Sequence, residues 1–253
     1  GCACLGERNK LIFIDMKYLA LFLLCLATGV ALAAPKTAAP EPAPEELKDT
    51  RDGKVYKTVR IGDQVWMAEN LNYSTPQSFC YDDRFTLCKT NGRLYTWLGA
   101  MNIPDRFKSE RYSSKLKKNH QGICPAGWHV PTNAEWQALA KAVEAVQDTC
   151  NDADVCTWKN VGKALKAASG WETEDGDATP NGENTSGFAA IPSGSRDMIS
   201  NYEGLGTAAR FWSAEEGIGN TYDAYHWTLT EDMLYFDAGY KNEGGSVRCV
   251  KNN

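Results

Sequence analysis

The sequence predicts an α+β domain in which two or three helices pack on short antiparallel strands. Helix-type patterns fall within residues 91–168, whereas the last part of the chain, from about residue 189, shows only short strand candidates. With 253 residues, 43% of them hydrophobic, the chain is long enough to bury a substantial core. An even number of cysteines, six, follows the first 33 residues, which favours disulfides if the chain leaves the cytosol.

Residues 16–33 have the pattern of a secretory signal peptide. Lys17 supplies a positive region, residues 18–32 form an apolar run, and small residues precede a cleavage point before Ala34. The alternatives are a transmembrane anchor, for which the run is short and lacks a basic stop signal, and a lipoprotein, for which Cys25 lacks the usual small residues before it. We expect cleavage, which leaves no stable transmembrane span. Residues 1–15 precede this complete signal and are expected to be an upstream extension of the gene model.

Residues 34–48 are rich in proline, alanine and glutamate and predict an extended linker before a domain that covers residues 49–253. The formal net charge is −5, and without residues 1–33 it becomes 24 minus 30, or −6. The densest basic cluster, Lys115 to Lys118, is typical of a solvated loop. The chain is therefore not expected to bind nucleic acid.

The first elements of the domain are expected to be a hairpin and a helix. Val59 and Ile61 alternate with polar residues before Gly62 and Asp63, which fits a two-residue turn that begins with glycine. The segment 91–101 carries apolar residues at helical spacing and precedes Pro104, so it predicts a short amphipathic helix.

The strongest helix signal begins at Thr132. Thr132 and Glu135 have the spacing of a capping box, and Trp136 starts an apolar face that continues to Val143. A further helix is expected over Trp158–Ala168, followed by an irregular polar loop. Short strands are predicted in the segments Ala189–Ile191, Arg210–Ser213, Tyr225–Thr230, Met233–Asp237 and Ser246–Val250, and Ser193 to Ser195 predict a tight turn.

Several blocks of the sequence occur in an order typical of one family. They are Arg51 to Tyr73, NGRLYTWLGAM from Asn91, GICPAGWHVP from Gly122 followed by Glu135 and Trp136, SGFAAIPSG from Ser186, FWSAEE from Phe211 and SVRCV from Ser246. This ordered set resembles the Fibrobacter succinogenes major paralogous domain, a family of extracytoplasmic bacterial modules. The resemblance implies a C-type lectin-like fold, distantly similar to that of formylglycine-generating enzymes, but no settled activity.

The cysteines beyond the leader are Cys80, Cys88, Cys124, Cys150, Cys156 and Cys249, and the sequence alone does not choose among their pairings. The resemblance implies a long-range bridge between Cys124 and Cys249. We expect the other four to close small loops as Cys80 with Cys88 and Cys150 with Cys156.

Two ligand sites are hypotheses at this stage. A polar loop contains Glu172, Glu174, Asp175 and Asp177, whose carboxylates suit a structural calcium ion, although their spacing matches no helix-loop-helix calcium motif. The alternative is a solvated acidic loop, and no other cofactor is expected. Most tryptophans fall in or beside the family blocks and are expected in the core, whereas Trp158 and Trp227, with Tyr222 and Tyr225, are candidates for stacking on sugar rings.

Catalysis is not expected. The chain has three histidines and no Gly-x-Ser-x-Gly segment, and His129 and His226 are expected to pack or cap rather than to transfer protons. The formylglycine-generating relatives use a reactive cysteine pair, whereas every mature cysteine here is expected in a bridge. The tail residue Arg248 is expected to be buried and to pair with Glu69 or Glu135, because a buried guanidinium is costly without a partner.

The sequence therefore predicts an exported, disulfide-stapled, non-catalytic binding or adhesion module of the periplasm, cell surface or medium. Its expected partner is a polysaccharide or a cell-envelope protein. The alternatives are an enzyme that uses the loop face of the fold and a purely structural envelope component.

Overall fold

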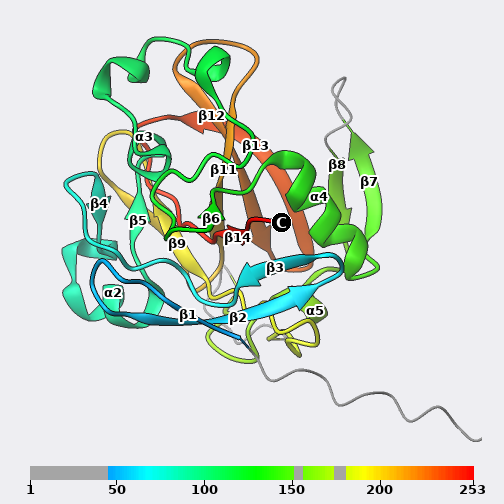
Figure 1. The fold of residues 1–253 in the computed structure, drawn as a ribbon. Coiled ribbons are helices and arrows are strands. Elements are labelled where there is room, and N and C mark those ends of the chain that lie inside the picture. The colour runs from blue at the N-terminus through cyan, green and yellow to red at the C-terminus, as the bar shows by residue number, and fades with distance from the viewer. Residues whose placement is uncertain (1–44, 151–155, 174–180) are drawn as a thin grey trace, which may run out of the picture. The chain divides into compact units, whose positions relative to one another are not determined.

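The computed structural model describes residues 45–150, 156–173 and 181–253 (Figure 1). This part of the chain is α+β, as predicted, with more strand than helix. The predicted leader and most of the predicted linker lie outside it. Within the described ranges, no helix has the length and apolar character needed to cross a membrane.

One sheet holds the two ends of the described domain together. In spatial order it contains β1 (Glu46–Lys48), β2 (Val55–Ile61), β3 (Gln64–Met67), β14 (Val250–Lys251) and β6 (Trp128–His129). The predicted hairpin is present, because Ile61 pairs with Gln64 across Gly62 and Asp63, and Gly62 has a φ of 58°. The last strand inserts between β3 and β6, with Val250 opposite both Trp66 and His129. The C-terminal segment is thus an interior strand of this sheet.

A second sheet forms most of the C-terminal half. Its order is β10 (Tyr202–Leu205), β9 (Ser193–Arg196), β11 (Ala209–Glu216), β12 (Asp223–Thr230), β13 (Met233–Tyr240), β8 (Cys156–Lys159) and β7 (Val146–Cys150). Strands β11, β12 and β13 are long, and the central one, β12, is antiparallel to both of its neighbours (Figure 1). Figure 1 also labels the short pair β4 (Ser78–Phe79) and β5 (Leu94–Tyr95).

The helices are α2 (Phe85–Asn91), α3 (Trp97–Met101), α4 (Asn133–Ala142) and α5 (Gly162–Leu165), with 3-10 turns η1 (Tyr81–Asp83), η2 (Asp105–Lys108) and η3 (Ser113–Lys115). The capping box predicted at α4 is present: the Thr132 side chain accepts from the Glu135 backbone N–H, and the Glu135 carboxylate accepts from that of Thr132. This arrangement satisfies two helix-end donors and fixes the start of α4.

One of the core clusters forms where α4 meets both sheets. Trp136 of α4 is fully buried, and its ring centroid lies 4.8 Å from that of Trp66 in β3 and 5.4 Å from that of Phe211 in β11. Trp227 of β12 stacks on Trp136 at 6.3 Å. Large aromatic side chains contribute the most apolar area per residue, so this cluster is a main source of the stability of the domain.

Three disulfides staple the domain and have the predicted pairings. Cys124 and Cys249 join positions 125 residues apart, whereas Cys80–Cys88 and Cys150–Cys156 close loops of 8 and 6 residues. Cys124 and Cys249 are fully buried. The long-range bridge therefore fixes the segment just before β14 to the middle of the chain.

Two predicted helices are shorter than expected. Leu94 and Tyr95 form β5 instead, and the helix starts only at Trp97, where the Thr96 hydroxyl accepts from the backbone N–H of Gly99. Likewise, β8 takes the start of the segment 158–168, because Trp158 pairs with Leu234 of β13. Strand pairing took precedence over helical spacing in both cases.

The strand predictions were right for β11, β12 and β13, and the predictions for three other segments were wrong. Ser193–Arg196 is a strand rather than a tight turn, and Ala190 makes only a single bridge to Lys166. The expected last strand is reduced to Val250–Lys251, because Ser246 instead makes a parallel bridge to Phe211.

Candidate functional site

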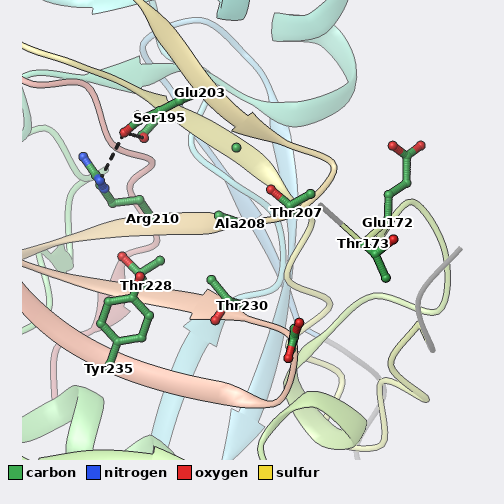
Figure 2. Close-up of a pocket in the computed structure, with 12 residues that line it drawn as sticks. Glu172, Thr173, Ser195, Glu203, Thr207, Ala208, Arg210, Thr228, Thr230 and Tyr235 are labelled. Carbon is green, nitrogen blue, oxygen red and sulfur yellow. Dashed lines mark hydrogen bonds and ion pairs between the residues drawn. The ribbon is translucent and has the colours of Figure 1, made fainter. Parts of the chain in front are cut away.

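The second sheet carries a polar pocket of about 500 Å³ on one of its faces (Figure 2). Arg210 in β11 lies opposite Thr228 in β12, and Thr228 lies opposite Tyr235 in β13. Directly opposed residues of neighbouring strands project on the same side of a sheet. These three side chains therefore form one row across three strands, and that row is part of the pocket wall.

Hydroxyl and carboxyl groups make up most of the remaining wall. The hydroxyl groups come from Thr173, Ser195, Thr207, Thr228, Thr230 and Tyr235, and the carboxyl groups come from Glu172, Glu203 and Glu231. These residues come from β9, β10, β12 and β13 and from the segments between strands, and Figure 2 shows those that it labels around one space. The pocket thus offers many hydrogen-bonding groups, and its lining is more polar than apolar.

Arg210 is held in place by two glutamates. Its Nη1 lies 2.9 Å from Glu243 Oε2, and its Nη2 lies 3.5 Å from Glu203 Oε1. Ser195 Oγ donates to the same Glu203 oxygen at 3.2 Å. Burial raises the pKa of Glu243, and the positive charge of Arg210 opposes that rise. The network therefore fixes one cation and one exposed carboxylate at the edge of the pocket.

The turn between β10 and β11 contacts the segment that carries Glu172, another carboxylate of the pocket wall. The backbone N–H of Glu172 donates to the Gly206 carbonyl at 2.8 Å. Gly206 has a φ of 86°, and a Cβ there would lie 3.0 Å from Glu172 Oε2. A side chain at this position would be strained and would crowd the carboxylate.

His226 lies two residues before Thr228 in β12, so both side chains project from the same face of the strand. Its neighbours on the adjacent strands are Trp212 and Asp237. Burial and, to a smaller extent, the positive charge of Arg210 together lower the pKa of His226 to about 3. Its Nδ1 lies 3.3 Å from the hydroxyl of Thr228. The imidazole is therefore neutral at ordinary pH and acts as a buried hydrogen-bonding support for Thr228, in line with its predicted packing role.

The predicted sugar platform was wrong for its two tryptophans. Trp227 is fully buried and donates its indole N–H to Asn133 Oδ1 at 2.9 Å, and Trp158 is 3% exposed in the same core cluster. Trp227 alternates along β12 with Thr228, so the strand that presents the threonine to the pocket directs the indole into the core. Tyr222 is half exposed, and Tyr225 packs edge-on against Phe236.

The predicted calcium loop falls mostly outside the described residues, which exclude Glu174, Asp175 and Asp177. Glu172 belongs to the polar pocket instead. No group of three or more histidine, cysteine or acidic side chains arranged to hold a metal ion occurs in the ranges that the structure describes.

The expected acidic partner of Arg248 was also wrong. The guanidinium is buried, but Nε donates to Asn70 Oδ1 at 2.8 Å, Nη2 donates to the Ala189 carbonyl at 2.8 Å, and Nη1 donates to the Phe188 carbonyl. Glu135 is not available to it, because this carboxylate lies 2.7 Å from Nε2 of the buried His129. His129 thus supports the capped end of α4, as predicted.

The model of the Fibrobacter succinogenes major domain family matches residues 59–251. The chain belongs to this family. The matched range of the Fibrobacter succinogenes major domain contains the whole polar pocket and the Cys124–Cys249 bridge. Comparison with the curated proteins and with the solved structures gave no match.

Sequence reasoning missed the central residues of the polar pocket, Arg210, Thr228 and Tyr235. A signal was present, because Thr228 and Thr230 alternate with Trp227 and Leu229 along β12. Such a two-residue period marks one polar and one apolar face of a strand. The strand pairing that places Arg210 and Tyr235 beside Thr228 cannot be predicted from the sequence of β12 alone.

Proposed function

We propose that the domain is an exported, non-catalytic module that binds a polysaccharide through the polar pocket. The observation that carries this proposal is the row Arg210, Thr228 and Tyr235, surrounded by hydroxyl and carboxyl groups in a pocket of about 500 Å³. This volume lies within the range typical of small-ligand sites. A sugar chain is rich in hydroxyl groups, and the pocket wall offers complementary donors and acceptors.

The chemistry of the wall favours hydroxyl-bearing ligands over apolar ones. Ionised carboxylates accept strong hydrogen bonds from hydroxyl groups, and threonine and tyrosine hydroxyl groups both donate and accept. Glu203 already accepts from Ser195 and Arg210, so its orientation is set before a ligand arrives. Preorganised polar groups lose less entropy on binding, which supports recognition by hydrogen bonds.

The three disulfides support the export of the module, because such bonds persist mainly in oxidising compartments. The bridge from the middle of the chain to its last strand also supports our proposal that the fold is C-type lectin-like and distantly related to formylglycine-generating enzymes. An experimental structure superposed on those folds tests this relation, and a different strand connectivity would refute it.

The test of binding is a glycan array with the oxidised protein, followed by calorimetry with the best oligosaccharide and with variants of the pocket. We expect Thr228→Val and Glu203→Gln each to weaken binding about tenfold, because each removes hydrogen bonds to a desolvated ligand. The matched controls, Thr86→Val and Glu110→Gln, change exposed residues outside the pocket and should bind as the wild type does.

The proposal fails if no glycan binds, or if the pocket variants bind as tightly as the controls. Tyr222→Leu tests the most exposed residue of the predicted platform, and a loss of binding in that variant alone would place the site elsewhere. Chromatography of the bound oligosaccharide after long incubation tests the enzyme alternative, because the appearance of shorter products would contradict a non-catalytic module.

A further inference from the structure

A second pocket, of about 480 Å³, lies beside the β2–β3 hairpin and the C-terminal end of α2. Its charged wall residues are Lys54, Lys57, Lys89, Arg248 and Glu69, so four of the five are basic. The chain as a whole has a net charge of −5. This basic pocket is therefore a local concentration of positive charge in an acidic protein, and it shares no residue with the polar pocket.

Arg248 is the fixed part of the basic pocket. Its side chain is 1% exposed and lies over the ring of Phe188, with the guanidinium carbon 4.4 Å from the ring centroid. Three of its five N–H groups are used by Asn70 and by the carbonyls of Phe188 and Ala189. Within the residues that the structure describes, one N–H of each Nη makes no hydrogen bond, so both nitrogens keep a donor for an anion.

No carboxylate neutralises this buried cation within the described residues, since the ion pairs found there do not include Arg248. Burial lowers the pKa of Arg248 to about 9, and the charge of Glu69 opposes that shift only in part. The Glu69 carboxylate itself accepts from the backbone N–H of Lys57 at 2.7 Å. A buried charge without an opposite charge is costly, and a bound anion would offset that cost.

The three lysines differ in how far they are already committed. Lys54 Nζ lies 2.7 Å from Asp52 Oδ2 and 2.7 Å from the Asn72 carbonyl, so it is held by the protein. Lys89 Nζ lies 5.2 Å from the ring centroid of Phe85, and the Lys57 ammonium has no ion pair or hydrogen bond within the described ranges. Lys57 and Lys89 are therefore the cations that can turn toward a ligand.

The segment whose carbonyls bind the Arg248 guanidinium has an unusual backbone conformation. Ala189 has a φ of 51°, a left-handed conformation that is unfavourable for alanine, and its carbonyl accepts from Arg248 Nη2. Asn184 supports this turn by accepting from the Ala189 backbone N–H at 2.7 Å. The guanidinium is thus held in one orientation by a strained segment that also forms part of the pocket wall.

We propose that the basic pocket is a second binding site, which takes a carboxylate or phosphate group between the fixed guanidinium of Arg248 and the ammonium groups of Lys57 and Lys89. The shared chemistry of these ligands is a compact anion with at least two oxygens on one centre. This site goes beyond the polysaccharide site proposed above, and either can exist without the other.

The test is an NMR titration of the oxidised, ¹⁵N-labelled protein at low salt with two probes, galacturonate and inorganic phosphate. We expect saturable shifts of the backbone amides of Gly92 and Ala189, which line the basic pocket, and none at Thr207 or Thr228, which line the polar pocket. The affinity should fall as salt is added, because the charges of Lys57 and Lys89 are accessible to ions. A response to only one probe identifies the anion class.

The deciding variant is Lys57→Gln with Lys89→Gln, whose side chains are not part of the core. Its affinity for the anion should fall ~10-fold, whereas the matched control, Lys117→Gln with Lys118→Gln, changes the net charge equally and should bind as the wild type does. Arg248→Lys keeps the charge but loses the planar pair of donors, and binding should be lost where that variant folds.

Three outcomes would overturn the proposal: no saturable shift with either probe, shifts outside the basic pocket only, or equal affinity in the Lys57/Lys89 variant and its control. Because the glycan variants Thr228→Val and Glu203→Gln leave this pocket intact, they should bind the anion normally. Failure of the polysaccharide site and failure of the anion site are therefore observed separately.

Discussion

Replacing both Cys124 and Cys249 by alanine tests how the fold is held together. These cysteines join positions 125 residues apart and are fully buried. Alanine removes the bond without leaving a buried hydroxyl group that lacks a partner, which serine would do. The comparison variant replaces Cys80 and Cys88 by alanine and opens a loop of only 8 residues.

The loop lengths set the expected magnitudes. In the chain-entropy model, the loss of the 125-residue closure lowers the free energy of unfolding by about 5 kcal/mol. The same relation gives about 2.5 kcal/mol for the 8-residue closure. A typical domain is stable by only about 5–15 kcal/mol, so the first variant should be close to unfolding and the second should remain folded.

Urea denaturation of the oxidised wild type and the two variants, followed by tryptophan fluorescence and by circular dichroism, measures the loss of unfolding free energy in each variant. The buried cluster around Trp136 makes fluorescence a direct reading of the core. The reasoning would be refuted if the variant without Cys124 and Cys249 were as stable as the comparison variant to within about 1 kcal/mol. Such a result would mean that the last strand is held by β3 and β6 alone.

The remaining predictions concern two buried ion pairs. Lys241 and Glu216 are 0% and 2% exposed and form a direct ion pair, so Lys241→Met should lower the free energy of unfolding by about 3–5 kcal/mol, measured in urea. Adding Glu216→Gln should restore part of that loss, and a double variant no better than the single one would contradict the reasoning. The second pair is His129 with Glu135. Burial lowers the pKa of His129, but the hydrogen bond and charge of Glu135 outweigh burial, so the pKa lies above 6.5. Burial raises the pKa of Glu135, but hydrogen bonds from His129 and Thr132 outweigh burial, so that pKa lies below 4.5. The stabilisation from this pair should be largest between about pH 4.5 and 6.5 and should decline as the pH rises through the pKa of His129. Urea unfolding measured from about pH 6 to 8.5 should show this decline in the wild type and not in His129→Gln. An unchanged pH profile in that variant would refute the assignment.

Local signals in the sequence identified the parts of the fold that depend on neighbouring residues. The capping box of Thr132 and Glu135 and the glycine-first turn at Gly62 each satisfy or shape the backbone within a few residues, so one segment suffices to predict them. The long disulfide between Cys124 and Cys249 was predicted from resemblance, because the order of the blocks carries information that spacing does not.

The errors arose where distant segments decide the outcome. Trp158 was assigned to a helix and to a sugar platform, but its pairing with Leu234 draws it into a strand and buries the indole. Arg248 was expected to find an acid, but the acceptors are carbonyls of Phe188 and Ala189, whose positions depend on an irregular segment. No pattern in the sequence identifies Leu234 as the partner of Trp158, or these two carbonyls as the partners of Arg248.

The placement of Arg248 also gives the C-terminal segment a role in more than stability. Arg248 directly precedes Cys249, and the following residue, Val250, pairs with both Trp66 and His129. The disulfide and the strand pairing thus fix the backbone on the C-terminal side of the arginine, while Asn70 and the 188–189 carbonyls fix its side chain. A guanidinium held by these contacts stays buried, and the proposed anion would offset the cost of its charge from the basic pocket, which Arg248 lines.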